Sequence, residues 1–460
     1  MGYPSFRGVL LVVCETALLM LAVIVATYVR LGWIASDILL YDNGLAKAVL
    51  VAVTFQACLY YADLYNLRLV SDRRELFIRV VQALSGASFI LAVLYYWFPT
   101  LMIGRGVFVV SAIFVAIFAC AWRFGFEWLT GRLRPRERLL LVGTSAGAVT
   151  LARELFERRW ELGVEIVGFV DADPARVGAP LINPGIIGTI DDIPAIVAKR
   201  RVDRVCVSLA DARGKLPMDK LLEMKVDGVS FDHLASLYEK YTGKIAIENL
   251  RPSWFIFSEG FRKGLVLSTM KRTLDVVAAS IGLLIGAPLM ALVALAVRLT
   301  SPGPVLYHQK RVGLQGREFT VHKFRSMRQD AEAATGAVWA SKSGDARLTG
   351  IGGWLRRTRM DELPQLWNVL IGEMSFVGPR PERPEFVGGL TREIPYYGQR
   401  HVVRPGLTGW AQVRYTYGAS MEDAVEKLQY DLFYIKNLSI ELDLYIIFET
   451  VKTVLLRRGA

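Results

Sequence analysis

The first third of the chain contains four apolar runs, each long enough to cross a lipid bilayer. They cover residues 8–29, 46–66, 80–103 and 106–129, and a helix of about 20 apolar residues matches the hydrocarbon thickness of a bilayer. The first run is too long for the apolar part of a cleavable signal peptide, and no small-residue cleavage site follows it. We therefore expect a bundle of four transmembrane helices over residues 1–135.

Basic residues indicate how this bundle is oriented. Arginines follow the second run (Arg68, Arg73, Arg74 and Arg79) and the fourth run (Arg132, Arg134, Arg136 and Arg138), whereas the other two loops are nearly neutral. Because loops rich in Lys and Arg stay in the cytoplasm, both ends of the bundle should face the cytoplasm. The whole chain carries a net charge of +12, which suits anionic lipid head groups or nucleotide phosphates.

A change of pattern marks a second module over residues 136–265. An apolar strand at 139–142 leads into a small-residue turn at 143–148 and a helix, and a second strand ends at Asp171. This order is typical of a Rossmann-like α/β fold, although Ser145 replaces one of the expected glycines. Two interpretations remain open: a nucleotide site with Gly143 at the phosphates and Asp171 on a ribose, or a retained fold that serves as a spacer or dimer platform.

A fifth apolar stretch, residues 274–299, has Pro288 near its midpoint. As a helix it would measure about 39 Å, which is enough to span a bilayer. Proline removes an internal hydrogen bond and bends a helix, so a re-entrant helix that enters and leaves on one face is the alternative. The sequence alone leaves both arrangements open.

Candidate phosphate-binding cations lie on a predicted hairpin that joins strands at 305–310 and 317–324. Strict alternation would place Lys323 and Arg325 on one face, beside Phe319 and Val321. Two neighbouring cations are suited to a diphosphate. A pair of solvated edge charges is the other interpretation.

The adjacent acids Asp361 and Glu362 stand three and two residues before Pro364. One interpretation is structural, because acids and proline favour the first turn of a helix. The other is chemical: a helix dipole and flanking arginines such as Arg356 would keep Asp361 ionised, and an ionised carboxylate can form an acyl-phosphate. Glu362 would then serve as an acid, a base or a metal ligand.

Further cations lie in loops that contain proline and glycine. Arg380 stands between two prolines in 378–381, and Arg404 and Gln412 bracket a loop suited to phosphates or a base. Residues 442–455 are typical of an interfacial amphipathic helix and lead to Arg457 and Arg458. The four His and four Cys residues show no metal-binding spacing, which argues against a zinc hydrolase.

Together these motifs resemble the bacterial sugar transferase family of monotopic phosphoglycosyl transferases, which start exopolysaccharide and O-antigen assembly. The resemblance rests on Ser301-Pro302-Gly303-Pro304-Val305, Lys323-Phe324-Arg325-Ser326-Met327, Asp361-Glu362-Leu363-Pro364-Gln365, Gly378-Pro379-Arg380-Pro381 and Pro405-Gly406-Leu407-Thr408-Gly409. These motifs occur in order within residues 268–460. The preceding bundle and Rossmann-like module resemble those of the family's large members.

The resemblance implies a catalytic domain over residues 266–460 at the cytoplasmic face of the bacterial inner membrane, with helix 274–299 re-entrant and, by analogy with large members, a homodimer. It implies transfer of hexose-1-phosphate from a UDP-sugar to polyprenyl (undecaprenyl) phosphate, with release of UMP. Asp361 would carry the phosphosugar covalently, and Glu362 would assist it and help bind Mg²⁺. Lys323, Arg325, Arg356 and Arg380 would offset phosphate charge, while Arg404 and Gln412 would approach the nucleotide.

Two other functions fit parts of the sequence. The α/β module could make the chain a membrane-tethered nucleotide-sugar oxidoreductase or dehydratase, which predicts bound NAD(H) and a need for Gly143 or Asp171. A non-catalytic assembly scaffold would instead be insensitive to Asp361→Asn. Nucleic-acid binding is disfavoured because the basic clusters adjoin apolar segments and do not form a continuous stripe.

Overall fold

The structure is a computed structural model. It describes residues 6–62, 64, 73–132, 137–157, 159–182, 184–208, 217–247, 258, 260–261, 264–329, 331, 347–415, 418 and 420–455. The predicted basic residues Arg68, Arg134, Arg136, Arg457 and Arg458 lie outside the described residues. The chain divides into two compact units, Met1–Leu237 and Tyr238–Ala460.

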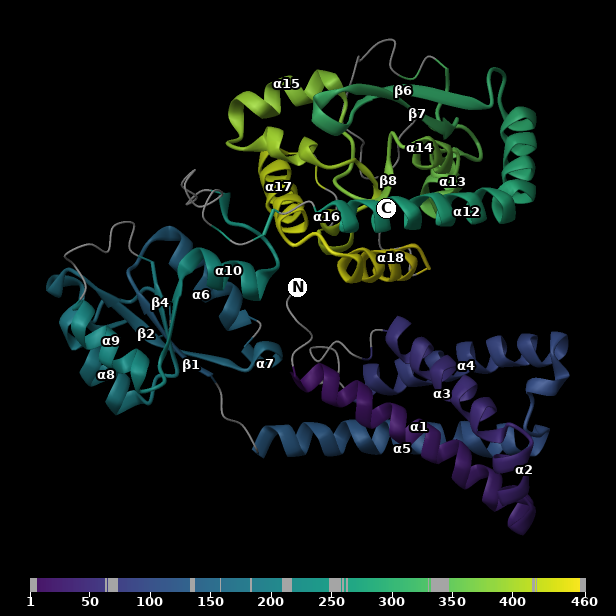
Figure 1. Cartoon of the computed structure of the whole chain (residues 1–460), viewed down its shortest axis with the longest axis horizontal. Helices are drawn as coiled ribbons and strands as arrows, with labels where there is room; N and C mark the ends of the chain where they lie inside the picture. The colour runs from purple at the N-terminus through teal and green to yellow at the C-terminus, as the bar shows by residue number, and fades with distance from the viewer. Residues whose placement is uncertain are drawn as a thin grey trace. The chain divides into compact units, whose positions relative to one another are not determined.

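Apolar helices form the first part of the first unit. They are α1 (Phe6–Leu31), α2 (Ala35–Tyr41), α3 (Gly44–Tyr61), α4 (Arg73–Trp97) and α5 (Arg105–Arg132), and Figure 1 shows the long ones side by side. Leu19, Phe55 and Leu91 are buried between them, while Trp33, Tyr96 and Trp97 are more than 70% exposed, as suits side chains that face lipid or its interface.

Three of the four predicted membrane segments are confirmed as helices long and apolar enough to cross a bilayer. These are Val12–Tyr41, Gly44–Tyr61 and Arg79–Trp97, and a fourth such helix is Leu265–Thr300 in the second unit. The predicted run 106–129 lies in α5. Its apolar part within the described residues, Gly106–Phe118, is too short to cross a bilayer. The fourth membrane segment of the bundle therefore stays a prediction.

The rest of the first unit is built on a five-stranded parallel sheet in the order β3-β2-β1-β4-β5. Its strands are β1 (Glu137–Val142), β2 (Val164–Asp171), β3 (Ile186–Thr189), β4 (Arg204–Val207) and β5 (Ser230–His233). The chief helices are α6 (Ala146–Glu157), α8 (Ile193–Arg200) and α9 (Met218–Val226). The predicted strand–turn–helix is confirmed, although α6 begins earlier than expected and shortens the turn.

The second unit carries the motifs of the predicted catalytic domain. Its elements include α12 (Leu265–Thr300), β6 (Leu306–Val312), β7 (Glu318–Phe324), α13 (Gly352–Thr358), the 3₁₀ turn η8 (Met360–Glu362), α14 (Gln365–Ile371), β8 (Ser375–Val377), α15 (Pro384–Glu393), β9 (Gly406–Thr408), α16 (Trp410–Arg414), α17 (Met421–Lys436) and α18 (Ile440–Leu455). The hairpin is confirmed: β6 and β7 pair antiparallel, with His308 opposite His322. Trp410 stacks on Phe433 in the main core.

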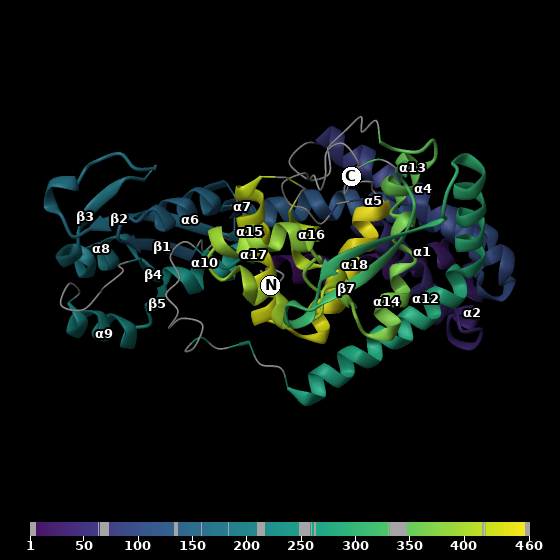
Figure 2. The same cartoon turned by 90° about the horizontal axis from the view of Figure 1, so that it is seen from above.

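Helix α12 consists of two arms that meet at a sharp bend, as Figures 1 and 2 show from two directions. In the first arm, Asp275 accepts hydrogen bonds from Ser375 Oγ and Phe376 N. In the second arm, Val293 and Val297 pack with Phe324 and Leu355. Pro288 lies inside this helix, where it disrupts the hydrogen-bond ladder. Both arms are thereby held on the same unit.

Candidate active site

Asp361 and Glu362 are buried in the 3₁₀ turn η8, directly before α14. Pro364 is the N-cap residue of α14, so the acids do lie at a helix start, as the structural interpretation predicted. Arg359 precedes them with φ +54°, a left-handed conformation that ends α13 and turns the chain inward. The local sequence thus places two carboxylates inside the unit.

Cations from three segments surround Glu362. Its Oε1 accepts hydrogen bonds from Lys323 Nζ at 3.1 Å and Arg380 Nη2 at 2.6 Å, and Arg359 Nη1 lies 3.5 Å from its Oε2. Lys323 comes from the end of β7 and Arg380 from the loop after β8. The fold therefore brings together Lys323, Glu362 and Arg380, which sequence analysis had singled out separately.

The two carboxyl groups have pKa values shifted in opposite directions. Burial raises the pKa of Asp361 to about 6, the charge of Glu362 adds to this, and Lys323 and Arg356 oppose it. Burial also acts to raise the pKa of Glu362, but Arg380, Lys323 and Arg359 outweigh it and hold that pKa well below its usual range. Arg356 thus acts in the direction that the sequence predicts, toward the ionised form, but burial outweighs it; at a pKa of about 6 the carboxyl group is still mostly ionised at neutral pH.

Four other predicted residues have partners outside this acid pair. Arg325 Nη2 donates to Ser301 O and Oγ, both at 2.8 Å, and Arg356 Nε donates to Ser326 Oγ at 3.1 Å. Arg404 Nε donates to Gly372 O at 2.9 Å, and Gln412 Nε2 to Leu407 O at 3.4 Å. Arg356 still acts on Asp361 through its charge. The phosphate-binding roles of these four residues stay predictions.

Strands β8 and β9 position the Arg380 loop. They pair parallel, Ser375 with Gly406 and Val377 with Thr408, and Gly406 N donates to Pro379 O. A Cβ on Gly406 would lie 2.1 Å from Gly378 N, so only glycine permits this approach. The motifs 378–381 and 405–409 therefore pack against each other and together hold the loop that carries Arg380.

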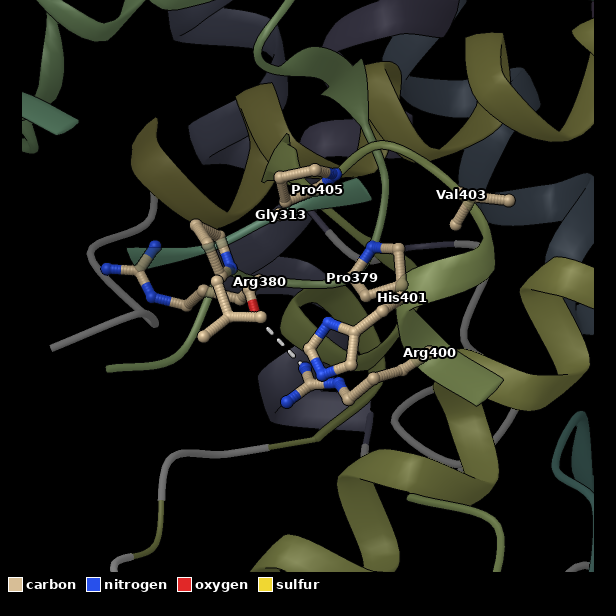
Figure 3. A pocket seen from close by; sticks show the side chains of 9 residues that line it. Gly313, Pro379, Arg380, Arg400, His401, Val403 and Pro405 are labelled. Carbon is tan, nitrogen blue, oxygen red and sulfur yellow. Dashed lines mark hydrogen bonds between the residues drawn. The ribbon is translucent and has the colours of Figure 1, made fainter. Parts of the chain in front are cut away.

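A buried ion pair that sequence analysis missed supports the same loop. Arg400 Nη2 donates to Arg380 O at 3.0 Å and to Asp431 Oδ2 at 2.8 Å. A signal was present, because Asp431 is a lone carboxylate in a run of apolar and aromatic residues and such a group needs a buried partner. Figure 3 shows Arg400 beside Pro379 and His401 in a pocket of about 10 Å³, which is about the volume that one water needs. This pocket is too small for a substrate.

The carboxylates of Asp361 and Glu362 fit a magnesium ion whose remaining ligands are water and phosphate oxygens. The described residues include no cluster of three or more His, Cys, Asp or Glu side chains suited to a metal. Two adjacent carboxylates nevertheless match Mg²⁺, which uses one or two of them and completes its shell with water and phosphate oxygens. Burial and neighbouring charges, not hydrogen bonds, are the causes that shift the pKa of Asp361.

In the first unit, the residues predicted to bind a nucleotide contact other residues of the same α/β module. The Asp171 carboxylate accepts hydrogen bonds from Thr144 Oγ1 and from Arg176 Nη1, the latter at 2.9 Å. Ser145 and Ser208 share a hydrogen bond between the ends of β1 and β4. Gly143 has φ +97°, which the turn after β1 requires. These contacts explain the residues without a ligand.

Several helices are long and apolar enough to cross a membrane, and the same chain holds a buried carboxylate pair with shifted pKa values, a combination typical of a membrane-associated enzyme. The model of the bacterial sugar transferase family matches residues 266–457, and that of a CoA-binding domain matches residues 61–230. The chain belongs to the bacterial sugar transferase family, and the resemblance of its motifs is thereby confirmed.

Several curated relatives are named phosphotransferases. The chain is 36% identical to the undecaprenyl-phosphate glucose phosphotransferase of Komagataeibacter xylinus, over 79% of this chain and 72% of the relative. It is 32% identical to the UDP-glucose:undecaprenyl-phosphate glucose-1-phosphate transferase of Escherichia coli K12, over 72% of this chain and 70% of the relative. The N-acetylgalactosaminephosphotransferase of Aeromonas hydrophila that acts on UDP-N-acetylgalactosamine and undecaprenyl phosphate is 43% identical, over 50% of this chain and 53% of the relative.

Proposed function

We propose that this chain transfers a hexose-1-phosphate from a UDP-sugar to undecaprenyl phosphate at the cytoplasmic face of the bacterial inner membrane. The observation that carries the proposal is the buried acid pair with Lys323 and Arg380 on Glu362. The names of the relatives in K. xylinus and E. coli supply the acceptor, and the E. coli name also supplies a UDP-sugar donor. The product would be the first lipid-linked sugar of a polysaccharide repeat.

In the first step, an Asp361 oxygen attacks the sugar-linked phosphorus of the donor. The bond from this phosphorus to the bridging oxygen breaks, and UMP leaves with that oxygen and its electron pair. Asp361 then holds the phosphosugar as an acyl-phosphate. A carboxylate with a pKa of about 6 is mostly ionised at neutral pH and more basic than an ordinary aspartate, which favours attack.

In the second step, a phosphate oxygen of the lipid acceptor attacks the same phosphorus. The acyl-phosphate bond breaks, Asp361 is restored as a carboxylate, and a polyprenyl diphosphate sugar leaves. Lys323 and Arg380 keep Glu362 ionised and also act on Asp361 through their charge, so they would offset phosphate charge in both steps. Bound by Asp361 and Glu362, Mg²⁺ would supply further charge neutralisation to the diphosphate.

The bend of α12 supports a re-entrant insertion. A straight helix of the 36 residues in α12 would be about 54 Å long, well beyond the hydrocarbon thickness of a bilayer. Exposed apolar side chains continue along it, including Leu284, Ile285 and Leu292, while polar contacts hold its first arm to the unit. Entry and exit on one face would keep the acid pair beside the cytoplasmic donor.

The test measures UMP release from a panel of UDP-sugars by purified wild type and Asp361→Asn, with Mg²⁺ and undecaprenyl phosphate. We expect UMP from one donor with the wild type and at least a 10³-fold loss in Asp361→Asn. Acid-quenched wild type should also carry a phosphosugar on the peptide that contains Asp361. Equal activity of the two proteins would contradict the proposal.

A further inference from the structure

The backbone that carries Arg380 is held at four consecutive carbonyl groups, those of residues 379–382. Each of these carbonyl oxygens accepts a hydrogen bond from a different residue. In chain order, the donors are Gly406 N at 2.9 Å, Arg400 Nη2 at 3.0 Å, Arg311 Nη1 at 3.0 Å and Val312 N at 2.9 Å. They belong to β9, to η9 (Tyr397–Val402) and to the end of β6, and Figure 3 shows the bond from Arg400. Three separate elements therefore fix the path of this loop.

Carbonyl groups are the main anchors of the loop because Pro379 and Pro381 have no N–H to donate. Each proline ring also fixes its own φ, so the backbone on both sides of Arg380 has little freedom left. A loop fixed in this way presents its side chain with little entropy to lose when a ligand binds. The anchored side chain is the one whose Nη2 donates to Glu362 Oε1 at 2.6 Å.

Arg311 holds the carbonyl of Pro381, and its own side chain is held in turn. Its Nε and Nη2 donate to Gln309 Oε1 at 3.1 and 2.6 Å, and its Nη1 lies 3.9 Å from Glu382 Oε2. Gln309 stands two residues earlier on β6 and so shares the same face of the strand. The Arg311 side chain is only 18% exposed. Its guanidinium is therefore oriented before it meets the loop.

A direct electrostatic effect on the acids is the alternative role for Arg311. Burial lowers its pKa, Glu382 opposes this, and the charges of Arg380 and Glu362 also act on it. In the described part of the chain, however, its side chain donates hydrogen bonds to Gln309 and to Pro381 O. These contacts favour an action through the loop.

We infer that Arg311 is a positioning residue, which keeps the Arg380 guanidinium on Glu362 by holding the carbonyl of Pro381. The inference rests on the proposed function, in which Arg380 offsets phosphate charge. A misplacement of about 1 Å at a reacting site costs up to about 10²-fold in rate. Because three of the four carbonyl groups stay anchored without Arg311, we expect a smaller loss, of about tenfold.

The kinetic test asks whether Arg311 acts through Arg380. It compares single-turnover UMP release by wild type, Arg311→Met, Arg380→Met and the double variant. Loss of Arg311 should slow release about tenfold when Arg380 is present and less than twofold when Arg380 is already absent. Losses of equal size in both backgrounds would overturn the inference, since a general structural defect or an independent charge effect gives that result.

Lys310→Met is the matched control for this comparison. Lys310 is the preceding residue of β6, points to the other face of the strand, and has a side chain that is 75% exposed. It should release UMP at the rate of its parent in both backgrounds. A loss as large as that of Arg311→Met would show a general defect of β6 and overturn the inference.

Gln309→Leu separates position from charge. This variant keeps the Arg311 cation but removes the oxygen that accepts two of its hydrogen bonds. We expect UMP release to slow at least threefold when Arg380 is present and to stay unchanged in Arg380→Met. A wild-type rate of Gln309→Leu beside a slow Arg311→Met would mean that Arg311 acts by charge alone, which overturns the inference. Gln309→Leu also serves if Arg311→Met fails to fold.

Hydrogen exchange tests the loop without turnover. In the full-length protein, peptides that contain residues 378–383 should exchange at least fivefold faster in Arg311→Met than in wild type, and Lys310→Met should match wild type. Unchanged exchange in Arg311→Met would overturn the inference. Failure of the proposed function looks different: wild type then releases no UMP from any UDP-sugar, while exchange still reports whether Arg311 holds the loop.

Discussion

The carboxyl group of Asp361 gives the proposed donor step a defined pH dependence. Its pKa is about 6 because burial and the charge of Glu362 both disfavour ionisation. The attacking form is the ionised one, so single-turnover UMP release should be constant above about pH 7. It should fall about tenfold per pH unit below pH 6. If the rate of UMP release begins to fall only below pH 4, this assignment of the pKa to Asp361 is contradicted.

Lys323 should matter far more than another lysine of the same hairpin. Lys323 Nζ lies 3.1 Å from Glu362 Oε1, whereas the side chain of Lys310 is 75% exposed and pairs with Glu318. Removing a buried cation at a charge-developing site costs about 10²–10³ in rate. We expect that loss in kcat for Lys323→Met and less than a twofold change for Lys310→Met. Similar kcat values for the two variants would show that Lys323 does not contribute to catalysis.

Helix α12 is fastened to α18 by a buried ion pair that should stabilise the second unit. Lys271 Nζ lies 2.6 Å from Asp443 Oδ2, and the Asp443 side chain is 1% exposed. Lys271→Met leaves a buried carboxylate without its cation, which costs about 3–5 kcal/mol of unfolding free energy. In detergent, the midpoint of thermal unfolding should fall by roughly 10 °C.

The double variant Lys271→Met/Asp443→Asn separates this charge effect from packing. Removing both charges should restore more than half of the lost midpoint, because an amide can still accept the Tyr434 hydroxyl hydrogen bond made to Asp443. If the double variant is less stable than Lys271→Met, the pair acts through side-chain packing and not through charge.

Local sequence patterns predicted the elements better than the partners of their side chains. Alternation placed Lys323 correctly because it lies inside β7, but Arg325 lies beyond Phe324, where the strand ends and alternation no longer applies. Arg325 turns to Ser301 instead. The pairing of Arg400 with Asp431 spans 31 residues, so only the tertiary fold brings the two together. Motif recognition found the acid pair, whereas the tertiary fold set its two pKa values: burial raised that of Asp361, and Arg380, Lys323 and Arg359 lowered that of Glu362.

The whole chain combines two units, and the parallel sheet of the first should not take part in transfer. Asp171 is bound by Thr144 and Arg176 of the same module, so Asp171→Asn should lower its thermal stability and leave UMP release within twofold. Calorimetry with NAD(H) should give no heat of binding. Loss of transfer in a folded Asp171→Asn protein, together with NAD(H) binding, would favour the oxidoreductase alternative.

Membrane topology is decided by the two ends of α12. Thiols introduced by Gly264→Cys and Lys310→Cys flank the helix, and a Cβ at residue 264 meets no atom within 4 Å. If α12 is re-entrant, a membrane-impermeant maleimide should label both positions only after spheroplasts are permeabilised.

Tyr41→Cys provides the outside reference, because residue 41 lies between the first two predicted membrane segments and its tyrosine is 85% exposed. It should be labelled in intact spheroplasts, while wild type controls for the native cysteines, of which Cys206 is buried. Labelling of residue 264 or 310 alone in intact spheroplasts would mean that α12 crosses the bilayer. The first arm would then lie across the membrane from the second, which the contacts of both arms with the same unit oppose.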